Sequence, residues 1–260
     1  MSRCLDRDDH CPRCEASLPF DFTMAFQPIV DVAKARVTTH EALVRGPKGE
    51  SAYSILSRVT PKLLYRFDQA CRIRAIELAS QLGMTSDLSI NFLPNAVYEP
   101  TACIQATLDV SKKVGWPTER LVFEVTETEP VQDQQHLRNI IDTYRRMGFA
   151  TALDDFGNGY ANLDLLTVLR PDRLKIDRTL VSDCDQDPRR QAILRSLVSL
   201  ASELDIDLIA EGVETRDEAL WLARHGLTHQ QGFFHARPAL EALASGLEPH
   251  LQALRRALAE

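Results

Sequence analysis

The chain has 260 residues, 44% of them hydrophobic, and a formal net charge of −7 at pH 7. Its length suits one large α/β domain or two small ones, and its acidic balance argues against a general binder of nucleic-acid polymers or membrane surfaces, which need basic patches. The sequence has no apolar run of about 20 residues and no signal-peptide pattern, so we expect no direct membrane insertion and a cytoplasmic location.

The six cysteines are scattered, at positions 4, 11, 14, 71, 103 and 184, which is not the dense pattern of a disulfide-stapled secreted domain. The last three are predicted to be core thiols. Cys4, His10, Cys11 and Cys14 are close enough in sequence to hold Zn²⁺, but a leader with reduced thiols fits as well, because a second Cys-x-x-Cys is missing. We expect residues 1–21 to form a cysteine-containing N-terminal leader and residues 22–260 to form the folded domain.

The first predicted elements are two strands over 25–30 and 37–44, separated by a short Asp-Val-Ala-Lys turn. This spacing is typical of a hairpin, so we expect the two strands to be antiparallel. Further strands are predicted over 88–93, 121–126, 150–154, 173–177, 207–211 and 227–232, and helices over 63–81, 101–115, 134–147, 189–203, 216–225 and 241–259. Their alternation predicts parallel strands joined by crossover helices.

Eight strands over about 235 residues match the usual size of a (β/α)8 barrel. The predicted fold class is therefore α/β, a TIM-like (β/α)8 barrel with an antiparallel first strand. A doubly wound open sheet is the alternative. That fold normally carries a glycine-rich phosphate loop after its first strand, and the sequence has none there.

One stretch, Thr151-Ala-Leu-Asp-Asp-Phe-Gly-Asn-Gly-Tyr160, sets Asp154 and Asp155 between an apolar run and a glycine turn. Successive side chains of a strand point to opposite faces, so both carboxylates can face one site only where the strand ends and the backbone turns. A carboxylate pair beside a hydrophobic strand indicates a divalent metal or a shared proton. The alternative is a solvated strand-to-helix loop in which an aspartate caps the helix.

Polar residues recur within or at the end of nearly every predicted strand, about one βα unit apart. They are Glu41, Asn91, Glu124, Asp154 with Asp155, Lys175, Glu211 and Gln231. In a closed parallel barrel such positions converge on one mouth, and carboxylates with an amide oxygen are the ligands that Mg²⁺ and Mn²⁺ prefer. For any single position, a salt-bridged surface charge remains the alternative.

Five carboxylates in this set would need more than one divalent ion to offset their charge. A two-metal site is typically used for in-line displacement at phosphorus. Lys175 and Arg45 would supply positive charge for a phosphate, Arg45 through its planar fork. Cysteines and multiple histidines are missing from these positions, which argues against structural zinc or redox chemistry there.

Over about residues 22–245 the sequence resembles the EAL-domain cyclic-di-GMP phosphodiesterases of bacteria. The motifs that carry the resemblance are Glu41-Ala42-Leu43-Val44-Arg45, Asn91, Glu124-Val-Thr-Glu127, Asp154-Asp155-Phe156-Gly157, Lys175-Ile176-Asp177, Glu211-Gly212-Val213-Glu214 and Gln231-Gly232. The resemblance implies that residues 22–260 form an EAL phosphodiesterase domain. Such a domain is a TIM-like barrel that hydrolyses one phosphodiester bond of cyclic-di-GMP to linear pGpG, with a water activated by two Mg²⁺ or Mn²⁺ ions.

The resemblance also implies a role for each site residue. One ion would be held by Glu41, Asn91, Glu124 and Asp154, and the second by Asp154, Asp155 and Glu211; Lys175 would contact the attacking water, Glu211 would help to take its proton, Arg45 would bind phosphate, and Gln231 would support the substrate or the water. Glu127 would anchor the loop after the paired aspartates, which in this family couples dimerisation to activity. A homodimer is therefore expected.

The sequence departs from the family pattern in that loop and near its end. Asn158, Ala161 and Asn162 replace the usual threonine and serines, and His235 stands where an aromatic residue is commoner. Asparagine tolerates left-handed turn geometry, so we expect the loop to form. These changes leave the activity level open, and a catalytically idle cyclic-di-GMP-binding receptor or scaffold domain is the alternative function. A different Mg²⁺-dependent barrel enzyme is a third interpretation.

Overall fold

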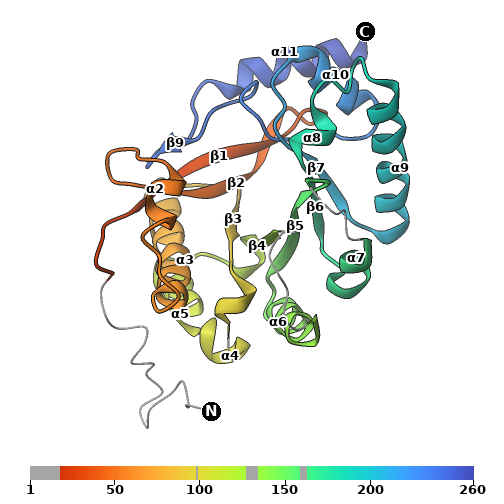
Figure 1. Cartoon of the computed structure of the whole chain (residues 1–260). Coiled ribbons are helices and arrows are strands. Elements are labelled where there is room, and N and C mark those ends of the chain that lie inside the picture. Colours follow the sequence, from red (N-terminus) through yellow and green to blue (C-terminus); the bar gives the residue numbers. More distant parts are fainter. Residues whose placement is uncertain (1–17, 98, 127–133, 159–162) are drawn as a thin grey trace.

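The computed structural model describes residues 18–97, 99–126, 134–158 and 163–260, and its strands form one closed sheet with helices around the outside (Figure 1). The strands are β1 (Thr23–Asp31), β2 (Arg36–Arg45), β3 (Asp87–Asn91), β4 (Leu121–Thr126), β5 (Ala150–Phe156), β6 (Arg173–Ile176), β7 (Asp207–Ala210), β8 (His229–Gln230) and β9 (Ala239–Leu240).

Most helices follow a strand and cover the outer face of the sheet (Figure 1). They are α2 (Ala52–Leu56), α3 (Leu64–Gln81), α4 (Pro100–Cys103), α5 (Gln105–Val114), α6 (Gln134–Arg146), α7 (Leu163–Leu169), α8 (Arg178–Val181), α9 (Pro188–Leu204), α10 (Arg216–Arg224) and α11 (Leu247–Ala259), with short 3-10 turns η1 (Pro94–Ala96) and η2 (Thr118–Arg120).

The sheet confirms the predicted barrel and its reversed first strand. Strands β2 to β8 run parallel in chain order, and β1 pairs antiparallel with β2 on one side and with β8 on the other. The β1–β2 hairpin sets Gln27 opposite Glu41, and the β1–β8 pairing sets Val30 opposite Gln230. The ring is therefore closed by the first strand, and the carboxyl ends of the seven parallel strands open on one mouth.

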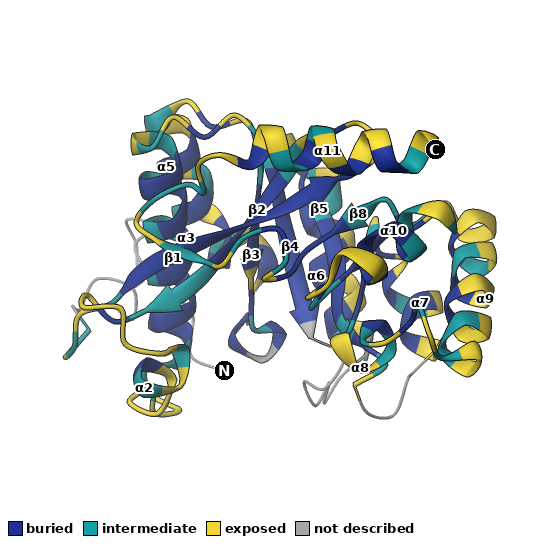
Figure 2. Cartoon of the chain, turned by 90° about the horizontal axis from the view of Figure 1, so that it is seen from above, coloured by how far each residue is buried: buried dark blue, intermediate teal, exposed yellow. Residues whose placement is uncertain are grey.

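The core lies between the strands and the helices. Strand residues are mostly buried, whereas the outward sides of the helices are exposed (Figure 2). In β3, Leu88 and Ile90 belong to the main hydrophobic cluster, while the alternating Ser89 is buried on the other face of the strand. Phe123 packs against Tyr144 and Phe149, with ring centroids 5.1 Å away in both cases. Strand alternation thus leaves the inner face of the barrel available for polar residues.

The structure corrects the end of the chain as read from the sequence. The closing helix was predicted over 241–259 but begins at Leu247, after Gly246 in a left-handed conformation with φ 73°. Ala239–Leu240 forms β9 instead and pairs with Ala25 and Phe26 of β1. The physical reason is the shortness of β8, whose two residues leave much of that edge of β1 unpaired.

Other differences are smaller. The helix predicted over 101–115 begins at Pro100 and is interrupted at Ile104, and the short helices α2, α7 and α8 were not predicted. Cys71, Cys103 and Cys184 are buried free thiols, as predicted. Cys4, His10, Cys11 and Cys14, together with Glu127, Ala161 and Asn162, lie outside the described residues. Within the described ranges, no helix is long and apolar enough to cross a membrane.

Candidate active site

The polar residues predicted from the strands gather at the mouth of the barrel. Glu41 lies near the end of β2, Asn91 ends β3, Glu124 is in β4, Asp154 and Asp155 are in β5, Lys175 is in β6, and Glu211 and Gln231 directly follow β7 and β8. Parallel pairing sets Asn91 beside Glu124 and Asp154 beside Thr126. The fold therefore brings together residues that are up to 190 positions apart in the chain, as the hydrogen bond between Gln231 and Glu41 shows.

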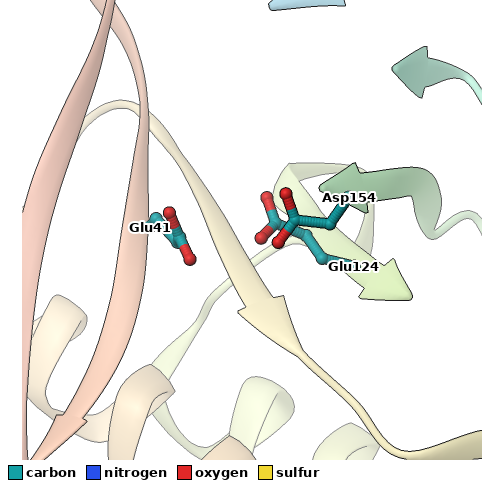
Figure 3. A group of neighbouring side chains, drawn as sticks. All are labelled: Glu41, Glu124 and Asp154. Atoms are coloured by element: carbon teal, nitrogen blue, oxygen red, sulfur yellow. The ribbon is translucent and has the colours of Figure 1, made fainter. Parts of the chain in front are cut away.

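Three buried carboxylates form the first group that could hold a metal ion. Glu41, Glu124 and Asp154 each offer one oxygen, and these oxygens lie within 4.8 Å of one another. Figure 3 shows the three side chains reaching toward a common space from β2, β4 and β5. The Asn91 Nδ2 atom donates to Glu41 Oε1 at 3.1 Å, which leaves the Asn91 carbonyl oxygen as a further hard donor.

A second group shares Asp154 with the first. Asp154, Asp155 and Glu211 also offer oxygens within 4.8 Å of one another. Two adjacent strand residues can do this because Asp155 has a left-handed φ of 58° and the β5–β6 register shifts between Leu153 and Phe156. The strand predicted to end at residue 154 in fact continues to Phe156, so a local irregularity, rather than the strand end, turns both aspartates to one side.

Lys175 lies in the middle of these carboxylates and is fully buried. Its Nζ atom is 2.8 Å from Glu211 Oε1, 3.0 Å from both Glu124 Oε2 and Asp154 Oδ1, and 3.3 Å from Glu41 Oε2. These four contacts satisfy the donors of the ammonium group, which burial alone would force to lose its charge. One lysine nevertheless faces the five carboxylates of the two groups, so negative charge is in excess.

The pKa values of the carboxyls at the mouth reflect first their burial and then this excess of negative charge. Burial raises the pKa of Glu124 to about 8; Lys175 opposes the rise, and Glu41 and Asp154 add to it. Burial and then repulsion from Asp154 raise the pKa of Asp155 to about 6. Burial also raises the pKa of Glu211 well above its usual range. Carboxylates that resist ionisation because they are buried and lie beside one another, and that offer only oxygen donors, fit hard divalent cations.

A cavity of about 260 Å³ opens beside the carboxylates. It is lined by Gln27, Glu41, Leu43, Asp177, Arg178, Glu211, Gly212, Glu214, Gln231, Gly232 and Phe233. The Gln231 Nε2 atom donates to Glu41 Oε2 at 2.7 Å and to Gln27 Oε1 at 3.3 Å. Among the described residues, the buried Gln231 Oε1 atom has no hydrogen-bond partner, so an acceptor remains for a bound molecule.

Several lining residues were not predicted to be functional. Gln27 is a buried polar residue in the apolar run Ala25-Phe-Gln-Pro-Ile-Val30, the same signal that identified the other strand residues. Arg178 and Glu214 form a bidentate ion pair in which both N–O distances are 2.7 Å. The sequence motif that contains Glu214 had suggested no role for this residue. Spacing alone does not reveal this cavity wall, because loops after β6 and β7 build it.

Arg45 lies on the same face of β2 as Glu41 and Leu43, because side chains alternate along a strand. Its Nη1 atom donates to the carbonyl oxygen of Val44 at 2.7 Å. Leu43 lines the cavity, so the arginine starts from the correct face but its guanidinium is directed to its own strand. It would need a different side-chain rotamer to reach a phosphate in the cavity.

The family model described as EAL domain matches residues 17–238. The chain belongs to the EAL domain family. A standalone versatile EAL protein from Vibrio cholerae, solved in a c-di-GMP-bound form, is 47% identical with a TM-score of 0.87, and the match covers 91% of this chain and 99% of that one.

Two further EAL relatives connect the family to a reaction and to a metal. The cyclic di-GMP phosphodiesterase RocR of Pseudomonas aeruginosa is 34% identical over 163 residues, which are 62% of this chain and 41% of RocR. The manganese and cyclic-diGMP complex of BlrP1 from Klebsiella pneumoniae is 37% identical with a TM-score of 0.80, covering 87% of this chain and 58% of that one. The chain spans 28% to 59% of the length of the first three curated relatives it matches.

Proposed function

We propose that this chain is a metal-dependent phosphodiesterase that hydrolyses one phosphodiester bond of cyclic-di-GMP to linear pGpG. The observation that carries the proposal is that two clusters of three carboxylates, which have Asp154 in common, lie beside an open cavity in an EAL domain. RocR, a relative at 34% identity, is named a cyclic di-GMP phosphodiesterase. An intact carboxylate set favours turnover over simple binding, because a receptor for the dinucleotide has no need of every acid.

The donor set suits two Mg²⁺ or Mn²⁺ ions. Glu41, Asn91, Glu124 and Asp154 would hold one ion, and Asp154, Asp155 and Glu211 would hold the other. When bound, such ions supply a water that is acidic enough to act as a nucleophile, and they offset the charge of the phosphate.

The chain's own residues would bind and orient the reactants. Glu211, whose pKa is raised by burial, takes a proton from the attacking water, whose oxygen bonds to phosphorus as the bond from phosphorus to the 3′ oxygen breaks. The leaving 3′ oxygen takes a proton from solvent water, so that the product is a linear dinucleotide with a 5′ phosphate. Lys175 donates a hydrogen bond to the attacking water in place of one of its carboxylate contacts, and Arg45 pairs with the phosphate after a change of rotamer. Gln231 Oε1 accepts a hydrogen bond from the substrate or the water.

Two parts of the proposal concern the protein beyond its site. We infer a cytoplasmic homodimer in which Glu127 anchors the loop that follows Asp154 and Asp155, so that dimerisation adjusts activity. Sedimentation would measure the oligomeric state, and Glu127→Ala would be expected to lower turnover without changing cyclic-di-GMP affinity. A variant that hydrolyses the substrate at the wild-type rate would contradict this coupling.

The test is direct. Purified protein is incubated with cyclic-di-GMP and Mg²⁺ or Mn²⁺, and linear and cyclic nucleotides are separated by chromatography. We expect linear pGpG with either ion, none after chelation, and little with Ca²⁺, which is larger, coordinates more loosely and would misplace the attacking water. Tight binding without any product would support the receptor function instead.

A further inference from the structure

A buried ion pair lies outside the barrel, on helix α3. The Arg72 Nη2 atom is 2.8 Å from Asp68 Oδ2, one helical turn away, and the two residues are only 1% and 4% exposed. Arg72 also donates to Thr107 Oγ1 on α5 at 3.3 Å. A buried ion pair adds little net stability compared with apolar residues of the same size, so its presence in the core calls for another explanation.

The other oxygen of Asp68 contacts the chain that leaves the mouth. Asp68 Oδ1 accepts a hydrogen bond from the backbone N–H of Leu93 at 3.0 Å. Leu93 follows Asn91, the last residue of β3, by two positions. Between them, the N–H of Phe92 donates to the carbonyl oxygen of Glu124 at 3.0 Å. The two residues after β3 are thus both held by hydrogen bonds from their N–H groups, Phe92 to β4 and Leu93 to Asp68 on α3.

This contact matters for Asn91 because that residue is exposed at the mouth. Its side chain donates to Glu41, which is itself a candidate ligand, so that contact cannot fix the position of Asn91 independently of the metal site. The backbone on its C-terminal side is held by a carboxylate in the protein interior. Arg72 supplies the charge that lets this carboxylate stay ionised there, since burial raises the pKa of Asp68 while Arg72 and the Leu93 N–H lower it.

We propose that Asp68 is a positioning residue for Asn91, and that its acceptor oxygen fixes the amide of Asn91 toward the ion held with Glu41, Glu124 and Asp154. The inference rests on the proposed function, because it assumes that Asn91 is a metal ligand. Arg72 serves in this arrangement only as the counter-charge of Asp68. The acceptor at position 68 is thus required, while the charge of the pair is not.

Two neutral double variants separate these roles. Removing one partner alone would leave an uncompensated buried charge and destabilise the fold, which would obscure the result. Asp68→Asn with Arg72→Met removes both charges and keeps an acceptor for Leu93. Asp68→Leu with Arg72→Met removes both charges and the acceptor. The two double variants have the same net charge and both lack the Arg72 guanidinium. A difference between them therefore measures the effect of the acceptor oxygen at position 68.

Metal binding is the main measurement, with Mn²⁺ as the probe and free Mn²⁺ followed by electron paramagnetic resonance. We expect the variant with Leu to bind Mn²⁺ about tenfold or more weakly than wild type, and the variant with Asn to bind nearly as wild type. At saturating Mn²⁺ the KM for cyclic-di-GMP should stay the same in both. Thermal unfolding in the absence of metal establishes that each is folded, and Asp68→Ala with Arg72→Met is a smaller second variant without the acceptor.

The outcomes distinguish the inference from the proposed function. Equal Mn²⁺ affinity in the variants with and without the acceptor would overturn the role of Asp68, even if the enzyme is active. Failure of the wild-type protein to bind Mn²⁺ would overturn the proposed function itself. As a control for general destabilisation, Arg173→Met removes the ion pair with Asp87 at the other end of β3 and should leave Mn²⁺ affinity unchanged.

Discussion

The two ends of the barrel interior differ in how many carboxylates surround the cation that β6 places there. Strand β6 carries Arg173 and Lys175 on one face, two residues apart. At the closed end, Arg173 donates to Thr39 Oγ1 at 2.9 Å and to Asp87 Oδ2 at 2.5 Å, so one cation meets one carboxylate. At the mouth, Lys175 contacts four carboxylates. The fold therefore does not require an excess of carboxylates over cations inside the barrel.

The cavities beside Arg173 and Lys175 also differ in size. The cavity beside Arg173 measures about 40 Å³, whereas the cavity at the mouth measures about 260 Å³. A balanced pair in a small space stabilises the barrel, and an unbalanced cluster beside a large space attracts cations and their anionic ligands. Substitutions at the two ends should therefore affect different quantities, with activity most sensitive at the mouth and stability at the closed end.

The largest effect is expected from Asp154→Ala, because Asp154 belongs to both groups of carboxylates. We expect turnover of cyclic-di-GMP to fall by at least about a hundredfold, while the unfolding temperature without metal changes little, since one of several repelling acids is removed. Asp87→Asn is the control at the closed end, where we expect full activity and a loss of about 1–2 kcal/mol in stability. Hydrolysis by Asp154→Ala at the wild-type rate would refute the site.

Lys175→Met should reduce both activity and stability. Removing the ammonium leaves buried carboxylates without their cation, which costs about 3–5 kcal/mol in the metal-free protein. Added Mn²⁺ should restore part of this stability, because the ions replace the missing charge. Urea unfolding with and without Mn²⁺ measures the effect, and Arg173→Met should show a loss that Mn²⁺ does not repair. If Mn²⁺ raised the free energy of unfolding equally in the two variants, the carboxylates around Lys175 would not be a specific cation site.

The barrel fold, and the convergence of the polar strand residues at its mouth, could be predicted from the sequence. Glu124 and Lys175 interrupt strands that are otherwise apolar, so their residue type and strand position together predict an inner, polar face. The left-handed backbone of Asp155 was not predictable, because it depends on a register shift between β5 and β6. Nor was the contact from Asp68 to Leu93, since helical periodicity predicts burial of a face but not the partner of a buried acid.

The long-range contacts of the cavity wall were also beyond sequence patterns. Gln27 and Gln231 are 204 positions apart and meet only because β1 closes the ring next to β8. The guanidinium of Arg45 shows another limit, since the residue directly follows the strand predicted over 37–44, but its hydrogen bond to Val44 depends on a side-chain rotamer. Periodicity fixes the face of an element, whereas rotamers and loop contacts need the folded neighbours.

The smallest effect concerns a neutral cluster next to the mouth. His235 Nε2 is 3.1 Å from Gln230 Oε1, whose Nε2 donates to the carbonyl oxygens of Ala219 and Leu227, so His235 must donate there as the neutral Nε2–H tautomer. Its Nδ1 atom then accepts from His250 Nε2 at 3.3 Å. Burial, and then the neighbouring His250, lower the pKa of His235 to about 3 from an ordinary value of 6.5.

Because the folded-state pKa is lowered, the unfolded chain binds the proton more readily between about pH 6.5 and pH 3, and stability is lost as pH falls through this window. At pH 5.5 His235 should cost about 1 kcal/mol relative to pH 8. His235→Phe should lower stability at pH 8, since Gln230 Oε1 loses its donor, and should flatten the dependence of stability on pH. Denaturant unfolding at several pH values tests this, and an unchanged slope would mean that His235 is not held neutral. Activity at pH 8 should change little, because this cluster, unlike the carboxylates around Lys175, carries no excess charge.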